Sequence, residues 1–411
     1  MSLHIVIAGP IACADVAQFL DDPSVKLPVG YAGAPMLGTL IGELLHRGHR
    51  VSAVTLSRDL PLRADATANF SGPKFTLACC PMRPKAWPMN GRLLGRIVDL
   101  YRFERQALQA AIAAANADVV HAHWAYEFAC AAVASGTPHV VTCHDAPFVV
   151  ARFQRDFRHG GYRWLRAGMA WHVLRRAGHV TAVSPYLVGK VQGLCRVPVR
   201  MVPNPMPRNA FNQQRSGADH PPRIAMVANG WSALKNPQAA FKAFALLSHQ
   251  MPQAELHVMG HDFGPHQTAQ RWWNAEKLKG KVLFHGEVRH DALLSQLAAS
   301  DLLLHPSLEE SFGAAPAEAL AMGVPVVGGL HSGAVPWVVG DGGLLVDVTR
   351  PQAMAQAMHD LLSNRVLANK LGQQGREQTL LRFSAAAVAS LYEAAYSAAI
   401  DACDVKKKAV A

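Results

Sequence analysis

Residues 301–329 read DLLLHPSLEESFGAAPAEALAMGVPVVGG, and their pattern indicates the class of fold. The apolar run 301–307 predicts a buried strand, and residues 316–322 predict a helix that leads to a second strand, 325–329. Strands that are continuously rich in Val and Leu, and that are joined through helices, are typical of a parallel sheet covered on both faces. Side chains at the junction of such a strand with its helix are candidates for ligand binding.

Two carboxylates, Glu310 and Glu318, bracket the turn between this strand and the helix. Pro316 suits a helix start because its missing N–H costs nothing there, so we expect Glu318 in the first helical turn. Free N–H groups at a helix start bind anions or hydroxyls, and Gly313 lets a ligand approach the backbone closely. Glu318 therefore either offsets the helix dipole or binds the hydroxyls of a ribose. Glu310 is either a solvated loop acid or faces the same ligand.

The same alternation of strands and helices runs along the 411-residue chain. It includes a long predicted helix at about 91–116, and it is interrupted by the polar, Pro- and Asn-rich segment 206–222. We therefore predict two tandem doubly wound, Rossmann-like α/β domains, 1–205 and 223–383, joined by this linker. The final helix, about 384–411, is expected to pack back on the first domain. Two such domains are expected to face each other across a ligand-binding cleft.

The composition favours a globular protein, since half of the residues are hydrophobic and 17% are charged. The seven cysteines are scattered and odd in number, which predicts free thiols in a reducing cytosol. No apolar run reaches the roughly 18 residues that a membrane-spanning helix needs. The opening MSLHIVIAGP is interpreted as a strand rather than a signal peptide. These features together favour a cytoplasmic location.

The net charge of +11 arises within residues 1–208, because the later residues carry as many acids as bases. Segment 151–179, ARFQRDFRHGGYRWLRAGMAWHVLRRAGH, contains seven arginines, interleaved aromatic residues and one acid, Asp156. It is either a solvated amphipathic helix packed on the domain or an interfacial face that meets anionic headgroups on the inner face of a membrane. No nucleic-acid-binding motif accompanies it, so nucleic acid is not an expected partner.

The segment HPSLEESFGAAPAEALAMGVPVVGG resembles the signature of the family 4 retaining glycosyltransferases of the GT-B fold. That signature has a strand ending in Pro-Ser, two glutamates around a Phe-Gly, a helix and Gly-x-Pro-Val-Val. The resemblance implies that Glu310 contacts the donor sugar and that Glu318 binds the ribose of a nucleoside-diphosphate sugar. It also implies that the backbone of Phe312, Gly313 and Ala314 reaches the sugar hydroxyls.

Two further segments resemble the parts of that family that hold the donor diphosphate. VGYAGAP matches the family's first glycine loop, which implies that Gly33 lets the diphosphate approach, although Pro35 stands where the family has an acid. VANGWSALKN implies that Lys235 clamps the diphosphate as a point charge. Asn229 stands where an arginine is usual, so donor affinity is expected to depend more on Lys235.

Two more segments continue the resemblance in the second half. KVLFHGEV implies that the backbone near Val288 pairs with the nucleobase edge. SGAVPWVV matches Gly-x-Pro-Glu-Val-Val, with Trp337 in the place of the acid.

In the first domain, HVVTCHD resembles the family's strand that ends in Thr-x-His-Asp. The resemblance places His144 against the donor sugar and the reacting centre. His121 and His123 end the preceding strand and are both candidates for lining the acceptor side, to which we assign His123 and Asp145. No third ligand has a spacing that would complete a metal site, and the family typically needs no metal.

The resemblance implies a metal-independent, cofactor-free hexosyltransferase that acts with retention of anomeric configuration. It would move a sugar from a nucleoside diphosphate to a saccharide or lipid-linked acceptor, in polysaccharide or glycolipid biosynthesis. A sugar-nucleotide epimerase of the same fold is an alternative. A second alternative is a non-catalytic nucleotide-sugar-binding protein, because Pro35, Asn229 and Trp337 depart from the signature. A third is a DNA-modifying glycosyltransferase, because the first half of the chain is basic.

Overall fold

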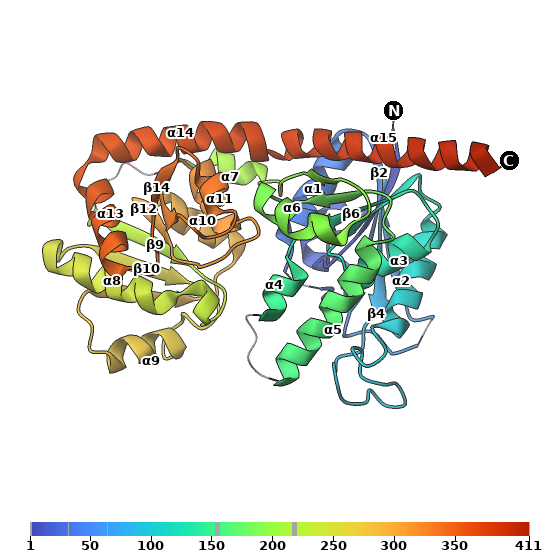
Figure 1. Ribbon diagram of the computed structural model, residues 1–411, viewed down its shortest axis with the longest axis horizontal. Coiled ribbons are helices and arrows are strands. Elements are labelled where there is room, and N and C mark those ends of the chain that lie inside the picture. Colours follow the sequence, from blue (N-terminus) through green and yellow to red (C-terminus); the bar gives the residue numbers. More distant parts are fainter. Residues whose placement is uncertain (1, 32, 64, 153–156, 216–219, 411) are drawn as a thin grey trace. The chain divides into compact units, whose positions relative to one another are not determined.

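The computed structural model describes residues 2–410 except 32, 64, 153–156 and 216–219. The chain forms two compact units, each built around its own sheet (Figure 1). Unit 1 runs to Pro205 and is completed by the segment that begins at Ala385, whereas unit 2 is Met206–Ser384. The predicted fold class of two Rossmann-like α/β domains is confirmed. Asp156 and its neighbours in the basic segment lie outside the described residues, as does part of the predicted linker.

The sheet of unit 1 has eight strands in the order β3-β4-β2-β1-β5-β6-β7-β8, and only the β3–β4 pair is antiparallel. Strands β1, β5 and β6 are central and almost wholly buried, because helices cover both faces of the sheet. The strands are β1 (His4–Ala8), β2 (Arg50–Ser57), β3 (Ala68–Gly72), β4 (Phe75–Pro81), β5 (Val119–His123), β6 (His139–Cys143), β7 (Val180–Ala182) and β8 (Val199–Met201).

The α-helices of unit 1 connect these strands and finish with a long C-terminal helix. They are α1 (Pro35–His46), α2 (Arg102–Ala115), α3 (Glu127–Ala134), α4 (Pro147–Arg152), α5 (Phe157–Leu174), α6 (Pro185–Val191) and α15 (Ala385–Val410). Short 3-10 turns η1 (Cys13–Phe19) and η2 (Gln192–Leu194) complete the unit.

The helix predicted at about 91–116 is shorter than expected, because it begins only at Arg102. The preceding loop is held in an irregular path by Arg83, whose guanidinium lies 2.6 Å from Glu104 and 2.8 Å from Asp99. The two residues before the helix have positive φ values of 51° and 62°, which a continuous helix does not allow. Buried ion pairing therefore overrides the local helical pattern.

The C-terminal helix α15 packs on α1 and contributes two buried tyrosines to the core of unit 1. The hydroxyl of Tyr396 lies 2.7 Å from Nδ1 of His121, whose Nε2 lies 2.7 Å from Oγ1 of Thr142. His121 is fully buried, so both of its ring nitrogens are satisfied inside the protein. This histidine joins α15 to the sheet and does not line the acceptor side, contrary to the interpretation of the sequence.

Replacement of Tyr396 by phenylalanine is expected to lower the free energy of unfolding by about 1–3 kcal/mol. The change leaves Nδ1 of buried His121 without its partner, and an unsatisfied buried polar group costs about that much. Urea denaturation followed by circular dichroism measures the difference. A variant as stable as wild type would show that the hydrogen bond does not hold α15.

The sheet of unit 2 has six parallel strands in the order β11-β10-β9-β12-β13-β14. They are β9 (Arg223–Val227), β10 (Glu255–Met259), β11 (Lys281–Gly286), β12 (Leu302–His305), β13 (Val326–Gly329) and β14 (Gly343–Val346). The helices are α7 (Arg208–Asn212), α8 (Pro237–Gln250), α9 (Thr268–Ala275), α10 (His290–Ala298), α11 (Ala314–Ala321), α12 (Val335–Val339), α13 (Pro351–Ser363) and α14 (Arg365–Phe383), with a 3-10 turn η3 (Ala233–Lys235).

The described part of segment 206–222 is not a free linker, although its composition predicts one. It contains α7, and Arg376 of α14 donates to the backbone carbonyls of Phe211 and Gln213 at 2.7 and 3.2 Å. The polar, Pro-rich composition reflects an irregular backbone whose carbonyls are satisfied by an arginine. Within the described residues, no helix is both long enough and apolar enough to cross a membrane.

Candidate functional site

The stretch that predicts the fold forms a strand, a turn and a helix at the carboxyl edge of the sheet of unit 2. Strand β12 is entirely buried, and Gly313 caps helix α11 with φ of 95°, a conformation that favours glycine. The helix begins at Ala314, two residues earlier than predicted from Pro316. Glu318 therefore lies in the second turn, and the prediction that placed it in the first turn is wrong. Capping the helix dipole is thus a poor explanation for this carboxylate.

Glu310 lies in a charged cluster rather than in solvent. Lys235 donates from Nζ to its Oε1 at 2.6 Å, and Nε2 of His305 lies 3.4 Å from the same oxygen. The Glu310 side chain is 17% exposed. Burial by itself raises the pKa of Glu310, but the contact with His305 and the charge of Lys235 lower it to about 2. Glu310 is therefore a carboxylate at every working pH, suited to accept hydrogen bonds and unable to supply a proton.

The loop that carries Lys235 is fastened to the loop that carries Glu310. Asn236 adopts a left-handed conformation, and its Nδ2 donates to the carbonyls of Pro306 and Val348 at 3.2 and 2.8 Å. The backbone N–H of Leu308 also donates to the carbonyl of Leu234. These bonds explain why the adjacent Lys235 meets Glu310. Asn229, which follows β9, is exposed, and its side chain has no hydrogen-bond partner among the described residues.

Glu318 is buried and accepts a hydrogen bond from a histidine that sequence reasoning missed. Nε2 of His290, the first residue of α10, lies 2.8 Å from Oε1 of Glu318. The Glu318 side chain is 10% exposed, so its other oxygen is the group left for a ligand. Val288 is half-buried between β11 and α10, two residues before this histidine. The only signal for His290 in the sequence is its place at the start of a helix beside the matched strand.

The aromatic residue that replaces the usual acid, Trp337, packs against the glycine turn. Its ring centroid lies 6.3 Å from that of Phe312 and 5.3 Å from that of Phe383. The guanidinium of Arg382 stacks at 4.4 Å from the Trp337 ring, a cation–π contact. Phe312 is thereby buried, and Trp337 supports the backbone of the turn where an acid would have presented a charge.

In unit 1, the ends of the neighbouring parallel strands β5 and β6 bring two histidines together. Nδ1 of His123 lies 2.9 Å from Nε2 of His144, and the His144 ring stacks on Trp124 with centroids 4.1 Å apart. Burial lowers the pKa of His144 to about 3, and it lowers that of His123 well below its usual value. Both imidazoles are therefore neutral. They can donate or accept a hydrogen bond, but neither is a source of positive charge.

A cavity of about 260 Å³ lies beside these histidines, within unit 1. Both oxygens of Asp145 accept from the Tyr126 hydroxyl at 3.0 Å, and burial raises the pKa of Asp145. Gly33, with φ of 126° and open space around it, lies on the cavity wall. The wall combines a glycine, a carboxylate, a guanidinium and aromatic rings, contributed by Gly33, Asp145, Arg163, Tyr31, Trp124 and Tyr126.

One arginine of the basic segment is not solvated, contrary to the simpler interpretation of the sequence. Arg166 is 8% exposed, pairs with buried Glu127 at 3.0 Å and stacks at 3.8 Å on the ring of Tyr126. Arg163, one helical turn earlier, also lines the cavity, and its guanidinium has no hydrogen bond or ion pair to another described residue. The cavity therefore offers a free cation, a carboxylate and several aromatic rings.

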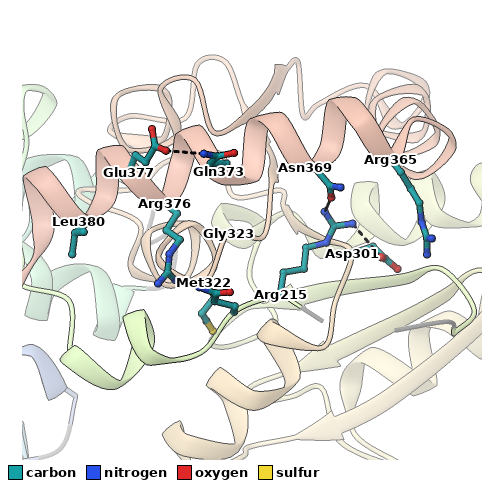
Figure 2. Close-up of a pocket in the computed structure, with 11 residues that line it drawn as sticks. Arg215, Asp301, Met322, Gly323, Arg365, Asn369, Gln373, Arg376, Glu377 and Leu380 are labelled. Atoms are coloured by element: carbon teal, nitrogen blue, oxygen red, sulfur yellow. Dashed lines mark hydrogen bonds and ion pairs between the residues drawn. The ribbon is translucent and has the colours of Figure 1, made fainter. Parts of the chain in front are cut away.

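A larger cavity, of about 570 Å³, lies in unit 2 beside the end of α11, and of its lining residues the family signature includes Gly323 (Figure 2). Two of its arginines, Arg215 and Arg376, are engaged in holding the fold. Arg215 bonds to Asn369 and Asp301, and Arg376 donates at 2.6 Å to the carbonyl of Ala321 at the end of α11. The contact with Arg376 fixes the C-terminal end of α11, the helix that carries Glu318.

No group of three or more His, Cys, Asp or Glu side chains in the described part of the chain is placed to hold a metal ion. All seven cysteines are free thiols. The predicted residues thus form two clusters. Lys235, Glu310, Glu318 and the turn at Gly313 gather in unit 2, and His123, His144, Asp145 and Gly33 gather in unit 1.

Two family models match consecutive parts of the chain. Residues 36–209 match "Glycosyltransferase Family 4", and residues 209–378 match "Glycosyl transferases group 1". N-acetyl-alpha-D-glucosaminyl L-malate synthase of Bacillus anthracis is 25% identical over 90% of this chain and 97% of its own length. D-inositol 3-phosphate glycosyltransferase of Corynebacterium glutamicum is 34% identical, over 40% of this chain and 41% of its own length.

Solved structures share the fold at low sequence identity. Sucrose-phosphate synthase from Thermosynechococcus elongatus superimposes with a TM-score of 0.70 at 18% identity, covering 96% of this chain and all of the other. The Anabaena protein HepE, in complex with UDP and glucose, gives a TM-score of 0.62 at 16% identity and covers 96% and 99% of the two chains.

Proposed function

We propose that this chain, which belongs to glycosyltransferase family 4 with the GT-B fold, transfers a sugar from a nucleoside diphosphate to a hydroxyl acceptor with retention of configuration. The observation that carries the proposal is the ionised Glu310 held by Lys235 beside the N-terminus of α11. A cation and free backbone N–H groups together suit a diphosphate, whereas a carboxylate suits sugar hydroxyls.

In the proposed reaction, unit 2 holds the donor. The leaving group is a nucleoside diphosphate, so the main electrostatic task is to stabilise the charge that develops on its phosphate oxygens. The ammonium of Lys235 supplies the positive charge that stabilises these oxygens, with Asn229 as an additional hydrogen-bond donor. The carboxylate oxygen of Glu318 that faces away from His290 accepts from the ribose hydroxyls, and the backbone near Val288 pairs with the base.

The roles of Glu310 and His144 follow from their protonation states. Glu310 accepts from the hydroxyls of the donor sugar and remains charged, which favours an oxocarbenium-like transition state nearby. Neutral His144 hydrogen-bonds the same sugar without adding positive charge. No residue among these is suited to the two-carboxylate mechanism of glycoside hydrolases, because Glu318 and Glu310 bind opposite ends of one donor.

The cavity of unit 1 is the proposed acceptor site. Its volume of about 260 Å³ suits a single ring, its aromatic rings suit the C–H faces of that ring, and Asp145 accepts from its hydroxyls. Arg163 is positioned for an anionic substituent. By their names, the curated relatives act on L-malate and on an inositol phosphate, and an anionic acceptor of this kind is consistent with a free guanidinium.

The first test is a thermal-shift panel of UDP, GDP and ADP and their sugars. A bound nucleotide raises the melting temperature by mass action, and we expect one base to give a clear shift. Glu318→Gln should weaken binding by about 10- to 100-fold, the effect of losing hydrogen bonds to a charged group. Glu276→Gln, an exposed glutamate of the same unit, is the charge-matched control. Wild-type affinity in Glu318→Gln would refute the ribose assignment.

Product analysis then separates the alternatives. A glycosyltransferase consumes donor only when an acceptor is present, apart from slow hydrolysis, and a retaining one yields an α-linked product from an α-linked donor. Conversion of the nucleotide sugar without an acceptor would instead identify an epimerase, and binding without turnover would identify a non-catalytic protein. The same assay with and without EDTA tests the proposed independence from metal.

A further inference from the structure

The outer face of α5 is unusually apolar for a helix that faces water. Its exposed positions include Trp164, Leu165 and Trp171, and the two tryptophans are 49% and 45% exposed. The opposite face is buried through side chains such as Met169 and Val173. The exposed tryptophans are therefore not needed for the core of unit 1. Only a binding partner would remove their exposed surface from water.

The loop between β4 and α2 continues this surface. It exposes the side chains of Trp87, Met89, Leu94 and Val98. The Trp87 ring lies against α5, within 3.7 Å of where a Cβ of Gly161 would be. The hydroxyls of Tyr101 and Tyr162 also meet at 2.5 Å. Figure 1 shows α5 and this loop at one edge of unit 1. We call the exposed apolar side chains of α5 and of this loop the Trp-rich face. They are Trp87, Met89, Leu94, Val98, Trp164, Leu165 and Trp171.

The charge of this surface is predominantly positive. Asp99, which follows Val98, is 24% exposed and is paired with Arg83 at 2.8 Å. Neither residues 84–98 nor residues 157–174 contain an aspartate or a glutamate, and both contain arginines. Arg175 and Arg176 continue the exposed face just after α5, and the guanidinium of Arg175 lies 5.2 Å from the Trp171 ring. Tryptophan and arginine interleaved with aliphatic side chains are typical of surfaces that lie at the headgroup level of a bilayer.

Two other occupants fit this surface less well. A second copy of the chain paired through the same face would bring two basic surfaces together, which costs free energy. Nucleic acid would use the arginines and tryptophans, but it has no use for exposed Met89, Leu94, Val98 and Leu165. An anionic bilayer accepts both the aliphatic side chains and the positive charge.

We propose that the Trp-rich face docks unit 1 on an anionic lipid surface as a peripheral contact. The inference does not depend on the glycosyl transfer proposed above, because it rests on surface residues outside the two clusters. If both hold, docking has a consequence for the acceptor. Tyr162 and Arg163 line the cavity, and the next residues of the same helix, Trp164 and Leu165, face outward. A docked unit would therefore hold its acceptor cavity close to the lipid headgroups.

The test is co-sedimentation of the full chain with phosphatidylcholine vesicles that contain or lack phosphatidylglycerol, at low and high salt. We expect binding only to the anionic vesicles, weakened by salt. Trp164→Ser/Trp171→Ser and Arg175→Gln/Arg176→Gln should each weaken it about tenfold or more. Val366→Ser/Leu381→Ser removes two side chains that are even more exposed, in unit 2, and should leave binding unchanged. Melting temperatures verify that every variant is folded.

Three results would overturn the proposal. One is equal sedimentation with both kinds of vesicle, or no sedimentation with either kind. Another is an effect of the unit 2 control as large as that of the tryptophan variant. The third is a dimer in light scattering, or an oligonucleotide complex in a mobility shift, that the tryptophan variant abolishes while lipid binding is absent. Nucleotide binding in the thermal-shift panel is scored separately, so failure of the lipid proposal is distinguishable from failure of the proposed function.

Discussion

Replacement of Lys235 by methionine is expected to lower kcat/KM for the nucleotide sugar by about 100-fold or more. Lys235 is the cation proposed to bind the diphosphate, since the usual arginine is Asn229 here. The loss of a charge–charge contact with a buried leaving group removes transition-state stabilisation of several kcal/mol. Methionine keeps the length of the aliphatic stem, so the change is mainly electrostatic.

The same variant has a second effect, because Lys235 is also the partner of Glu310 at 2.6 Å. Removing one member of a largely buried pair leaves an uncompensated carboxylate and costs up to about 3–5 kcal/mol of folding free energy. The double variant Lys235→Met/Glu310→Gln removes both charges and should recover most of that stability. It should not recover activity, because the diphosphate still lacks its cation.

Steady-state kinetics at saturating acceptor, together with urea denaturation, separate the two effects. Lys242→Met, an exposed lysine of α8, is the control for loss of a surface charge and should behave as wild type. If the double variant regained both stability and kcat/KM, Lys235 would serve only to neutralise Glu310, and its assignment to the diphosphate would be wrong.

The layered fold follows from the sequence because buried parallel strands have a strong local signature. The edge hairpin β3–β4 escaped prediction for a physical reason. Strand β3 is partly exposed, with a sequence, ANFSG, that is polar and short, and its pairing with β4 depends on contacts that local pattern does not encode. The start of α2 is likewise decided by the buried Arg83–Glu104 pair, whose members are 21 residues apart.

The candidate site shows the same division. Glu310, Lys235 and Glu318 belong to a motif with fixed spacing, so they could be named from the sequence. Their partner His290 comes from a separate element, α10, and is brought in by tertiary structure alone, whereas His305 ends strand β12 within the same motif. His121 and His123 are two residues apart on one strand, and so point to the same side of it. The sequence could not separate them, because α15, which covers His121, comes about 270 residues later.

Replacement of His144 by glutamine is expected to reduce kcat by about 100-fold while changing KM for the donor much less. In the proposed reaction this side chain touches the sugar near the reacting carbon, so its contacts matter most in the transition state. Glutamine retains hydrogen-bonding capacity at similar size, but it cannot reproduce the rigid imidazole stacked on Trp124. Single-turnover kinetics with saturating donor measure the chemical step directly. A rise in KM with unchanged kcat would instead make His144 a ground-state binding residue.

The same variant tests the neutral state of the imidazole through the pH dependence of stability. The pKa of His144 is lowered to about 3 by burial, whereas an unfolded histidine titrates near pH 6.5. Between these values the unfolded chain binds the extra proton, so stability is complete above about pH 6.5 and is lost as the pH falls toward 3. The contribution is about 1.4 kcal/mol for each pH unit.

Glutamine does not titrate, so His144→Gln should lose stability less steeply between pH 6.5 and 4 than wild type does. His331→Gln, an exposed histidine of unit 2, should keep the wild-type slope. An unchanged slope in His144→Gln would mean that the imidazole is already protonated or solvated in the folded protein, and a charged group at this position could not take the role proposed for it.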